Sequence, residues 1–385
     1  MRPLRATFLA FGFFWGTWAV VALDVQRFLE FSDAQLGLLL ASTVVGGVIA
    51  NGAGGVIAER HGTRTVLTSA LVVWGLLLLA LAATTNRTVF CATFLLTVSG
   101  GGLVDVTMNV AATAALGSFP GRLLRLHALF NGGALLGAGT SGLLLAHDIS
   151  YRLIWAGVSV VALLLALWCR GTDMPAGERG EHHTVRQGLA ALRAEGLGAV
   201  AIVFAIGALV EGGVGTWGVL FLRAHLGLAV AAGASAYVVG QALATTARST
   251  LGWTAEHVGE RRGAQFGLGL AGIGLLVEAT ATSSWLAAAG LGAAAVGAAV
   301  YWPLLLAFAS RGGARPGLVV GGLSAAGYVG FLAGPPVVGW VAQLTDLRWG
   351  LALLGAASLA GALVRLRVPN AFEAAGKPRT ESGAS

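Results

Sequence analysis

The chain has 385 residues, of which 56% are hydrophobic and only 11% are charged. Soluble domains carry about 25% charged residues, and a globule of this length could not enclose so much apolar surface. The composition therefore excludes a soluble globular protein and predicts an all-α membrane protein. The formal net charge of +7 does not indicate a nucleic-acid partner, because the basic residues fall between apolar runs and form no patch interleaved with aromatic residues.

Apolar segments of about 20 residues, the length that crosses a bilayer as a helix, recur along the whole chain. In chain order, the sequence predicts twelve transmembrane helices at 6–26, 36–57, 65–84, 88–116, 127–147, 152–169, 198–222, 229–252, 264–283, 285–309, 317–342 and 347–365.

The basic residues are distributed unevenly over the connections between these segments. If both termini lie on one face, nineteen of the 24 Lys and Arg residues lie on that face. The positive-inside rule then places both termini in the cytoplasm. Lys377 is the only lysine, an arginine bias typical of high-G+C bacterial coding, and we expect the membrane to be the bacterial inner membrane. The longest polar gap, 170–197, divides six segments from six, and we interpret it as a solvated linker.

Several short patterns recur about 197 residues apart. The polar loop Gly55–Arg64 shares its spacing with Gly252–Arg261, and the glycines of 133–142 recur in 330–339. Parallel six-helix repeats are typical of transporters whose two halves rock about a central site. The sequence therefore predicts two pseudo-symmetric six-helix bundles. The expected domains are 1–169, the cytoplasmic linker 170–197, a second bundle at 198–365 and a cytoplasmic tail at 366–385.

On these loops the chain resembles the major facilitator superfamily, whose loop signature is G-x-x-x-D-R-x-G-R-R. The chain departs from that signature at Glu59 and Thr65. The resemblance implies a cytoplasmic gate, in which the acid and the arginines of the loops pair across the interface between the halves. The implied gate residues are Gly55, Glu59, Arg60, Gly62, Arg64, Gly252, Glu256, Gly259 and Arg261. The segment 330–339 resembles the family's glycine-proline packing motif, with Gly330, Gly334, Pro335 and Gly339 as helix-packing residues.

Within the superfamily, the chain is most similar to the bacterial YbjJ/MosC-like and fucose-permease-like branch. The resemblance rests on Asp105–Asn109, on His127 with Asn131, and on the segment 327–335. It implies that an acid in the fourth span takes part in proton coupling.

Ionisable side chains inside hydrocarbon are costly and are therefore candidates for function. Asp105 lies within the fourth span and Glu211 near the middle of the seventh, and either could be the proton-coupling carboxylate. The alternative is a buried acid that neighbouring hydroxyls and amides satisfy. We expect Glu278 to be structural, and Asp24 and Arg27 to line the external entrance.

Aromatic and amide side chains could line a central cavity for sugars, polyols or organic cations. The candidates are Trp18, Asn109, Phe130, Asn131, Trp217, Gln241, Tyr301 and Trp302. No Arg or Lys stands at the predicted middle of the membrane, since Arg248 falls near a cytoplasmic end. The sequence therefore favours a small neutral or cationic substrate.

Motifs for catalysis, metal or cofactor binding are missing. Two G-x-G-x-x-G matches, 137–142 and 267–272, lie inside apolar spans and follow no strand. We therefore predict no enzyme, no cofactor and no metal, and a secondary active transporter working by alternating access. Its expected partners are a small-molecule substrate, protons and the lipid bilayer, and it is expected to be a monomer. The alternatives are an efflux pump for drugs or metabolites and, in another class, a membrane sensor that does not transport.

Overall fold

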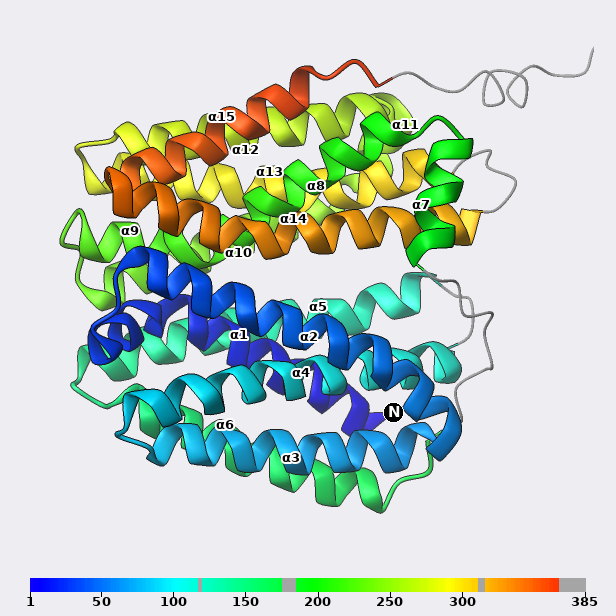
Figure 1. The fold of residues 1–385 in the computed structure, drawn as a ribbon, viewed down its shortest axis with the longest axis vertical. Coiled ribbons are helices and arrows are strands. Elements are labelled where there is room, and N and C mark those ends of the chain that lie inside the picture. The colour runs from blue at the N-terminus through cyan, green and yellow to red at the C-terminus, as the bar shows by residue number, and fades with distance from the viewer. Residues whose placement is uncertain (117–119, 175–184, 311–315, 367–385) are drawn as a thin grey trace, which may run out of the picture.

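The computed structural model describes residues 1–116, 120–174, 185–310 and 316–366, and helices occupy most of these ranges (Figure 1). The first group is α1 (Arg2–Leu29), α2 (Asp33–His61), α3 (Thr63–Ala83), α4 (Arg87–Leu116), α5 (Pro120–Ala146) and α6 (Tyr151–Arg170). A short α7 (Val185–Ala194) follows. The second group is α8 (Gly198–Gly213), η1 (Val214–Gly218), α9 (Val219–Ala224), α10 (Val230–Ser249), α11 (Leu251–His257), α12 (Glu260–Thr280), α13 (Ser284–Ser310), α14 (Pro316–Leu344) and α15 (Leu347–Leu363).

The helices have the length and apolarity that a bilayer requires. Among the described residues, nine helical segments are long and apolar enough to cross a membrane, and α15 is a shorter apolar helix of 17 residues. Many large apolar side chains, such as Leu164, Leu167 and Phe266, are exposed on the outside of the molecule. Such a surface is stable only against lipid, so the chain is a multi-pass membrane protein.

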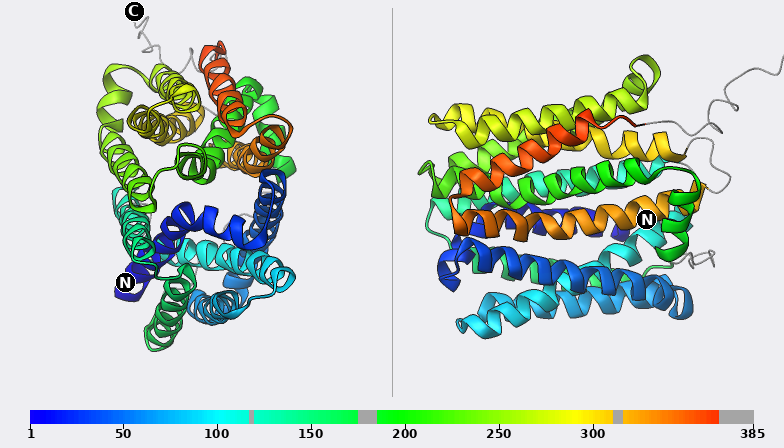
Figure 2. Two further views of the ribbon diagram at one scale, coloured as in Figure 1. Left: turned by 90° about the vertical axis from the view of Figure 1, so that its left-hand side faces the viewer. Right: turned by 45° about the horizontal axis from the view of Figure 1, so that its top comes forward.

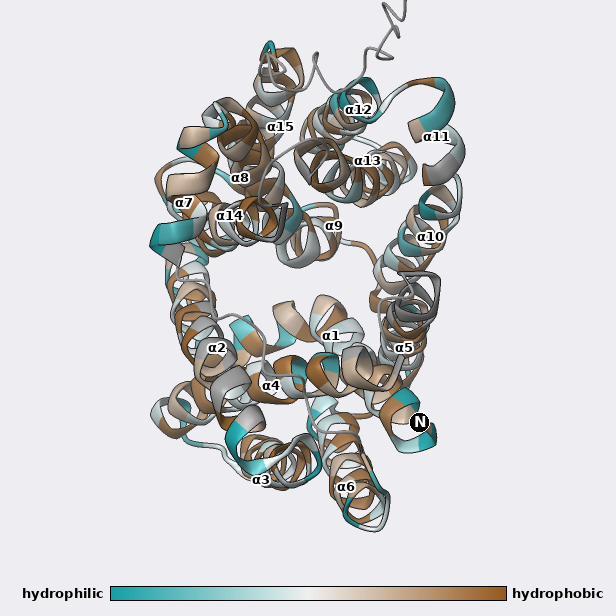
Figure 3. Ribbon diagram, turned by 90° about the vertical axis from the view of Figure 1, so that its right-hand side faces the viewer, coloured by the Kyte–Doolittle hydropathy of each residue, from teal (hydrophilic) through white to brown (hydrophobic). Residues whose placement is uncertain are grey.

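Each helix group is tightly packed within itself. In the first group α1 packs on α5, α3 on α6 and α2 on α4, while in the second group α8 packs on α14, and α12 on α13 and α15. Viewed end on, α2 lies beside α14 and α5 beside α10, on the two flanks where the groups meet (Figures 2 and 3).

Two tight turns depend on glycine. Gly62, between α2 and α3, has φ 82° and ψ 141°, and Gly259, before α12, has φ 86° and ψ 146°. Side chains other than hydrogen are strongly disfavoured in this backbone region. The same strained geometry thus occurs at both copies of the loop motif that the sequence shows 197 residues apart.

Glycines also permit backbone contact between helices. A Cβ atom on Gly133 of α5 would collide with the carbonyl oxygen of Leu9 in α1, and one on Gly330 of α14 would collide with that of Ala205 in α8. The predicted packing glycine Gly334 meets the carbonyl oxygen of Leu209 in the same way, at 2.5 Å. The α1–α5 and α8–α14 pairs therefore share one mode of close packing.

Replacing Gly330 with alanine should destabilise the protein, because its Cβ would overlap backbone that cannot move independently. We expect Gly330→Ala to lower the unfolding free energy by about 1–3 kcal/mol. The matched control is Gly321→Ala in the same helix, where a Cβ meets no described atom within 4 Å. Thermal unfolding of both purified variants in detergent measures the difference, and equal melting temperatures would contradict this account of the packing.

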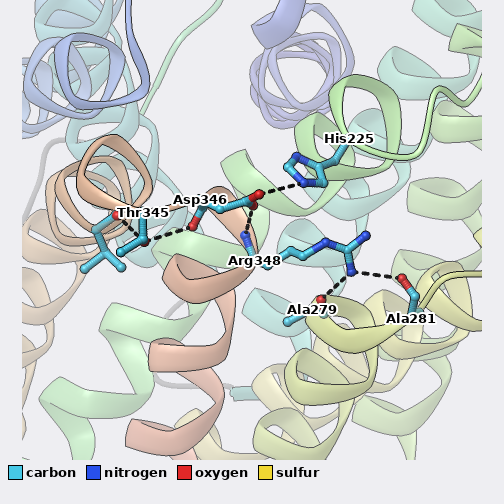
Figure 4. A network of polar contacts seen from close by, with 7 residues as sticks. His225, Ala279, Ala281, Thr345, Asp346 and Arg348 are labelled. Atoms are coloured by element: carbon cyan, nitrogen blue, oxygen red, sulfur yellow. Dashed lines mark hydrogen bonds and ion pairs between the residues drawn. The ribbon is translucent and has the colours of Figure 1, made fainter.

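An arginine at the start of α15 closes the end of α12. Arg348 donates from its guanidinium to the carbonyl oxygens of Ala279, at 2.9 Å, and Ala281, at 3.1 Å (Figure 4). Asp346 caps α15 by accepting from the backbone N–H of Arg348 at 2.8 Å, and its other oxygen lies 3.0 Å from Nε2 of His225. The last turn of α12 leaves carbonyl groups without helical partners. The Arg348 guanidinium satisfies two of the carbonyl groups at that end, and we call this contact the clamp.

The first helix group contains the same clamp. Arg152, at the start of α6, donates to the carbonyl oxygens of Ala82 and Thr84 at the end of α3. Arg348 follows Arg152 by 196 residues, and Ala279 follows Ala82 by 197. The internal repeat therefore extends to individual polar contacts that loop spacing alone does not indicate.

Three elements differ from the helices expected from the sequence. The segment expected to be a solvated linker contains α7, which packs on α14 so closely that the backbones of Gly188 and Gly322 touch. The seventh predicted span is interrupted by the π-helical turn η1, and the eighth breaks at Thr250 between α10 and α11. Hydropathy reports only that a segment is apolar, so it detects neither kind of interruption.

Candidate functional site

Two cavities adjoin α14. The first has a volume of about 260 Å³ and contains Asp105; the second has a volume of about 300 Å³ and contains Glu211. Tyr328 and Phe331 of α14 line both cavities, so the two cavities adjoin at these side chains. The first cavity is lined by Phe11, Trp15, Thr43, Gly47, Val98, Gly102, Asp105, Phe130, Tyr328 and Phe331. The second is lined by Glu211, Arg248, Trp302, Tyr328 and Phe331.

Asp105 stands in the middle of α4, with Asn109 one helical turn further on. The Asn109 side-chain nitrogen donates to the backbone oxygen of Asp105 at 2.9 Å and to its carboxylate at 3.1 Å. This i, i+4 contact orients the carboxylate on the cavity wall. Tyr328, from the second helix group, faces the same cavity. The predicted pair of residues in the fourth span is therefore joined by hydrogen bonds, and it holds a carboxylate on the cavity wall.

Glu211 lies in the last turn of α8, directly before η1. It interacts electrostatically with Arg248 of α10, which lines the same cavity and donates to the carbonyl oxygen of Ala299 at 3.4 Å. Tyr301, fully buried, also interacts with Glu211. Arg248, which the sequence places near a cytoplasmic end, therefore shares a cavity with Glu211.

The other predicted cavity residues divide into three sets. Phe130 and Trp302 line the cavities. Asn131 and Gln241 are half-buried and do not belong to the walls of these two cavities. Trp18, Trp217 and Tyr301 are at most 4% exposed and pack in the hydrophobic core. They do not belong to the walls of these two cavities, but Tyr301 lies behind the wall residue Glu211, with which it interacts.

Two tryptophans of α1, Trp15 and Trp18, lie on different faces of the helix. Phe11 and Trp15 are four residues apart, so they share the face of α1 that lines the first cavity. Trp18 points instead into its own helix group, where its ring lies 4.9 Å from that of Phe94. Tyr328 belongs to the motif at 327–335, but no signal in the sequence distinguishes its face of α14 from the others.

A buried ion pair joins the two helix groups. Arg223 of α9 donates to both carboxylate oxygens of Asp24 in α1, at 2.8 and 3.3 Å, and to the backbone oxygen of Val20 at 2.6 Å. The Arg223 side chain is 7% exposed and that of Asp24 is 25% exposed. Bidentate contacts of this kind are strong and directional. We call this pair the latch, and the end of the molecule that contains it the latch end.

Close backbone approaches between the two groups lie at the latch end as well. A Cβ on Gly37 of α2 would lie 2.7 Å from the carbonyl oxygen of Pro335 in α14, and one on Gly339 would collide with that of Asp33. On the other flank, a Cβ on Gly142 of α5 would lie 2.3 Å from the side-chain Cβ of Ala234 in α10. The described contacts therefore close the latch end.

At the opposite end, the loop arginines bind within their own helix group. Arg64 pairs with Asp173, beyond α6, at 3.1 Å, and Arg261 donates to the backbone oxygen of Leu366, beyond α15, at 3.0 Å. In this conformation these two arginines therefore do not pair across the interface, and their role in a cytoplasmic gate stays a prediction. Each arginine lies at the start of its helix, and its partner lies just beyond the last helix of its own group.

The gate role of the remaining predicted residues at that end stays a prediction. Arg60 and Glu256 are exposed to solvent. The side chains of Glu59 and His127, and the surroundings of Gly55 and Gly252, lie outside what the structure describes.

A second ion pair at the latch end stays within one group. Arg87, at the start of α4, pairs with Glu30, just after α1, and this hydrogen bond and the positive charge hold the pKa of the Glu30 carboxyl below its usual range. Both side chains are exposed, so we expect the pair to contribute little to stability.

Comparison with known proteins relates the chain to membrane transporters. The family model described as Major Facilitator Superfamily matches residues 5–276. An uncharacterized MFS-type transporter of Yersinia pestis is 27% identical over 350 residues, which is 89% of each chain. The membrane protein MosC of Rhizobium meliloti is 27% identical over 361 residues, 92% of this chain and 87% of MosC.

Solved transporters share the fold. A point mutant of the nucleoside transporter NupG superposes with a TM-score of 0.77 at 16% identity, over 97% of this chain and 100% of that one. The inward-open xylose transporter XylE of E. coli superposes with a TM-score of 0.71, also at 16% identity, over 97% and 98%. At this identity the similarity establishes the fold, and the substrates of these proteins are not thereby transferred.

Proposed function

Because this chain belongs to the Major Facilitator Superfamily and is a transporter rather than an enzyme, we propose that it moves a small polar solute across the bacterial inner membrane by alternating access. In this proposal the chain forms twelve spans in two six-helix bundles, with both termini in the cytoplasm. The latch end faces the outside, and the structure corresponds to the inward-facing state.

One observation carries the proposal: two carboxylates from different helix groups line adjoining cavities behind a closed latch. Asp105 belongs to the first group and Glu211 to the second, and the two cavities adjoin at Tyr328 and Phe331. A rocking motion that opens the latch would change the surroundings of both carboxylates at once, as alternating access requires.

Proton coupling is the form of energy input that these carboxylates favour. Glu211 has a charge partner, Arg248, on a neighbouring helix. A proton bound to Glu211 would release Arg248, and the movement of the proton could then be linked to that of α8 against α10. Asp105 is the alternative proton carrier, since its carboxylate also lies on a cavity wall.

The chemistry of the walls favours a neutral or cationic solute with a flat apolar face. Phe11, Trp15 and Phe130 surround Asp105 in the first cavity, and Trp302 stands beside Glu211 in the second. Aromatic faces stack on sugar and base rings and attract organic cations. Arg248 does not by itself favour an anion, because its charge is offset by Glu211. The same cavities also allow transport in the opposite direction, as an exporter of drugs or metabolites.

A ligand screen tests the substrate class first. Purified protein is mixed with sugars, polyols, nucleosides, amines and cationic drugs, and the melting temperature is measured. A bound ligand raises stability by about 2.7 kcal/mol at about a hundred times its Kd. Positive compounds are then tested in proteoliposomes, with a proton gradient imposed in either direction to distinguish uptake from export. Solute accumulation that is the same with and without the gradient would refute proton coupling.

A further inference from the structure

Glu278 is a buried acid that the proposed transport cycle leaves unused. It lies near the latch end of α12, is 0% exposed, and neither carboxylate oxygen has a hydrogen-bond partner among the described residues. A carboxylate buried without partners costs several kcal/mol in its ionised form. The neutral acid is therefore the form that this packing accommodates.

The carboxyl group is enclosed by two other elements. A Cβ added to Gly218, the last residue of η1, would lie 3.3 Å from Oε1 of Glu278 and 2.5 Å from Cδ1 of Leu291 in α13. α12 also crosses α13 in backbone contact, since a Cβ on Gly290 would lie 2.6 Å from the backbone nitrogen of Glu278. Glu278 thus packs against α13 at its backbone and against the end of η1 at its carboxyl group.

The repeat indicates that packing alone does not require an acid here. Ala82 and Ala279 are equivalent, because each accepts a hydrogen bond from the equivalent clamp arginine. The residue before Ala82 is Leu81, which is also 0% exposed. The first helix group therefore fills the position of Glu278 with an apolar side chain and remains fully packed.

The element that covers Glu278 also leads to the latch. η1 is a π-helical turn, a local widening of the helix that occurs mostly at functional sites. Its last residue, Gly218, lies five residues before the latch residue Arg223. The indole Nε1 of Trp217, next to Gly218, is also buried with no hydrogen-bond partner in the described part of the chain. η1 and Arg223 thus belong to one continuous segment, and a shift of this segment against α12 as the latch opens would expose Glu278 to water.

We propose that Glu278 is a second proton-binding site, separate from the cavities, which takes up a proton from the latch side and must be protonated before the latch can close. The inference rests on the proposed alternating access. A bare carboxylate is tolerated only while η1 is displaced and water reaches it. Closure then requires the neutral acid, so the closed state holds one proton more than the open state.

Few charged or titratable groups on the described parts of the adjoining elements compete for this role. They are Tyr301 on α13, Arg348 on α15, Glu256 and His257 on α11, and Glu211 and Arg223 on either side of η1. Arg348 is bound to the carbonyl oxygens of Ala279 and Ala281, and Arg223 to Asp24. Glu256 and His257 lie at the opposite end of α12, before its first residue.

Spin labels across the latch end test the proposal without a substrate. Cysteines are placed at the exposed positions His147 and Ala231, with Cys91 and Cys169 replaced by alanine, and pulsed electron-electron spectroscopy measures the distance between the labels. One linked proton changes the ratio of open to closed protein by up to about tenfold per pH unit. Because the closed state binds the extra proton, raising the pH should increase the open fraction.

Glu278→Gln should remove this pH dependence and leave the latch closed at every pH. Glu278→Leu, which copies Leu81, should behave in the same way and melt no lower than the wild type, which controls for folding. An infrared carbonyl band of a protonated acid that disappears in Glu278→Gln would identify the proton directly.

Two outcomes would overturn the inference. If Glu278→Gln opens with the same pH dependence as the wild type, the linked proton binds elsewhere, while alternating access itself stands. If the wild type shows one distance at every pH, Glu278 controls no opening. Solute flux in proteoliposomes would then decide the proposed transport function separately.

Discussion

Glu211→Gln is expected to abolish proton-driven accumulation of the transported solute while leaving exchange of solute across the membrane intact. A glutamine keeps the size and polarity of the side chain but carries no proton. A pH difference of one unit supplies about 1.4 kcal/mol per proton, which sustains about tenfold accumulation. We therefore expect the accumulation ratio to fall from about ten to about one. Uptake and counterflow into proteoliposomes, with the ligand found by thermal shift, measure the two processes.

Asp105→Asn is the matched comparison, because both changes neutralise a carboxylate on a cavity wall. If Glu211 carries the proton, Asp105→Asn weakens solute binding but keeps the accumulation ratio that the gradient allows. The reverse pattern would assign the proton to Asp105. Full proton-driven accumulation in both single variants would refute the coupling role of either residue.

Breaking the latch should shift the protein strongly toward the state that is open at the latch end. In Arg223→Ala the carboxylate of Asp24 loses the bidentate hydrogen bonds and the positive charge that stabilise it in its partly buried position. Removing one partner of a buried pair costs about 3–5 kcal/mol. Asp24 is partly exposed, so we expect about 2 kcal/mol, or roughly a thirtyfold change in the ratio of open to closed protein. The spin-label pair at His147 and Ala231 reports this ratio directly.

Arg87→Ala is the control for the latch variant. It removes an ion pair at the same end of the molecule, but Glu30 and Arg87 belong to the same helix group and are exposed. It should leave the distance distribution unchanged. The exchanged pair Asp24→Arg with Arg223→Asp should partly restore closure. A wild-type distance distribution in Arg223→Ala would show that helix packing alone holds the latch end closed.

Hydropathy was sufficient to predict where the helices lie. Every predicted span contains helical structure, because a backbone in lipid must satisfy its polar groups internally and an apolar run of about 20 residues has no better way to do so. The boundaries differ by a few residues, since helices such as α1 and α2 continue past the apolar run into polar ends. The π-helical turn η1 and the break at Thr250 could not be predicted, because they change hydrogen bonding and not hydropathy.

The candidate site was predictable in part. Asp105 and Glu211 were identifiable because an acid in an apolar run is rare and costly. Their aromatic neighbours were not, since nearly every face of these helices is apolar and periodicity cannot tell a cavity from the core or from lipid. Trp15 and Trp18 illustrate this, as one lines the cavity and the other packs against Phe94.

The sequence alone therefore determined the class of protein, the repeat and the acids, because composition, spacing and the cost of burying charge are local properties. Only the tertiary structure decided which charges meet. It placed Arg223 on Asp24, 199 residues away, and Arg248 beside Glu211, and it left Glu278 without a hydrogen-bond partner among the described residues. The energy of a charge in a membrane protein depends on what surrounds it within a few ångströms, and helix packing determines those surroundings.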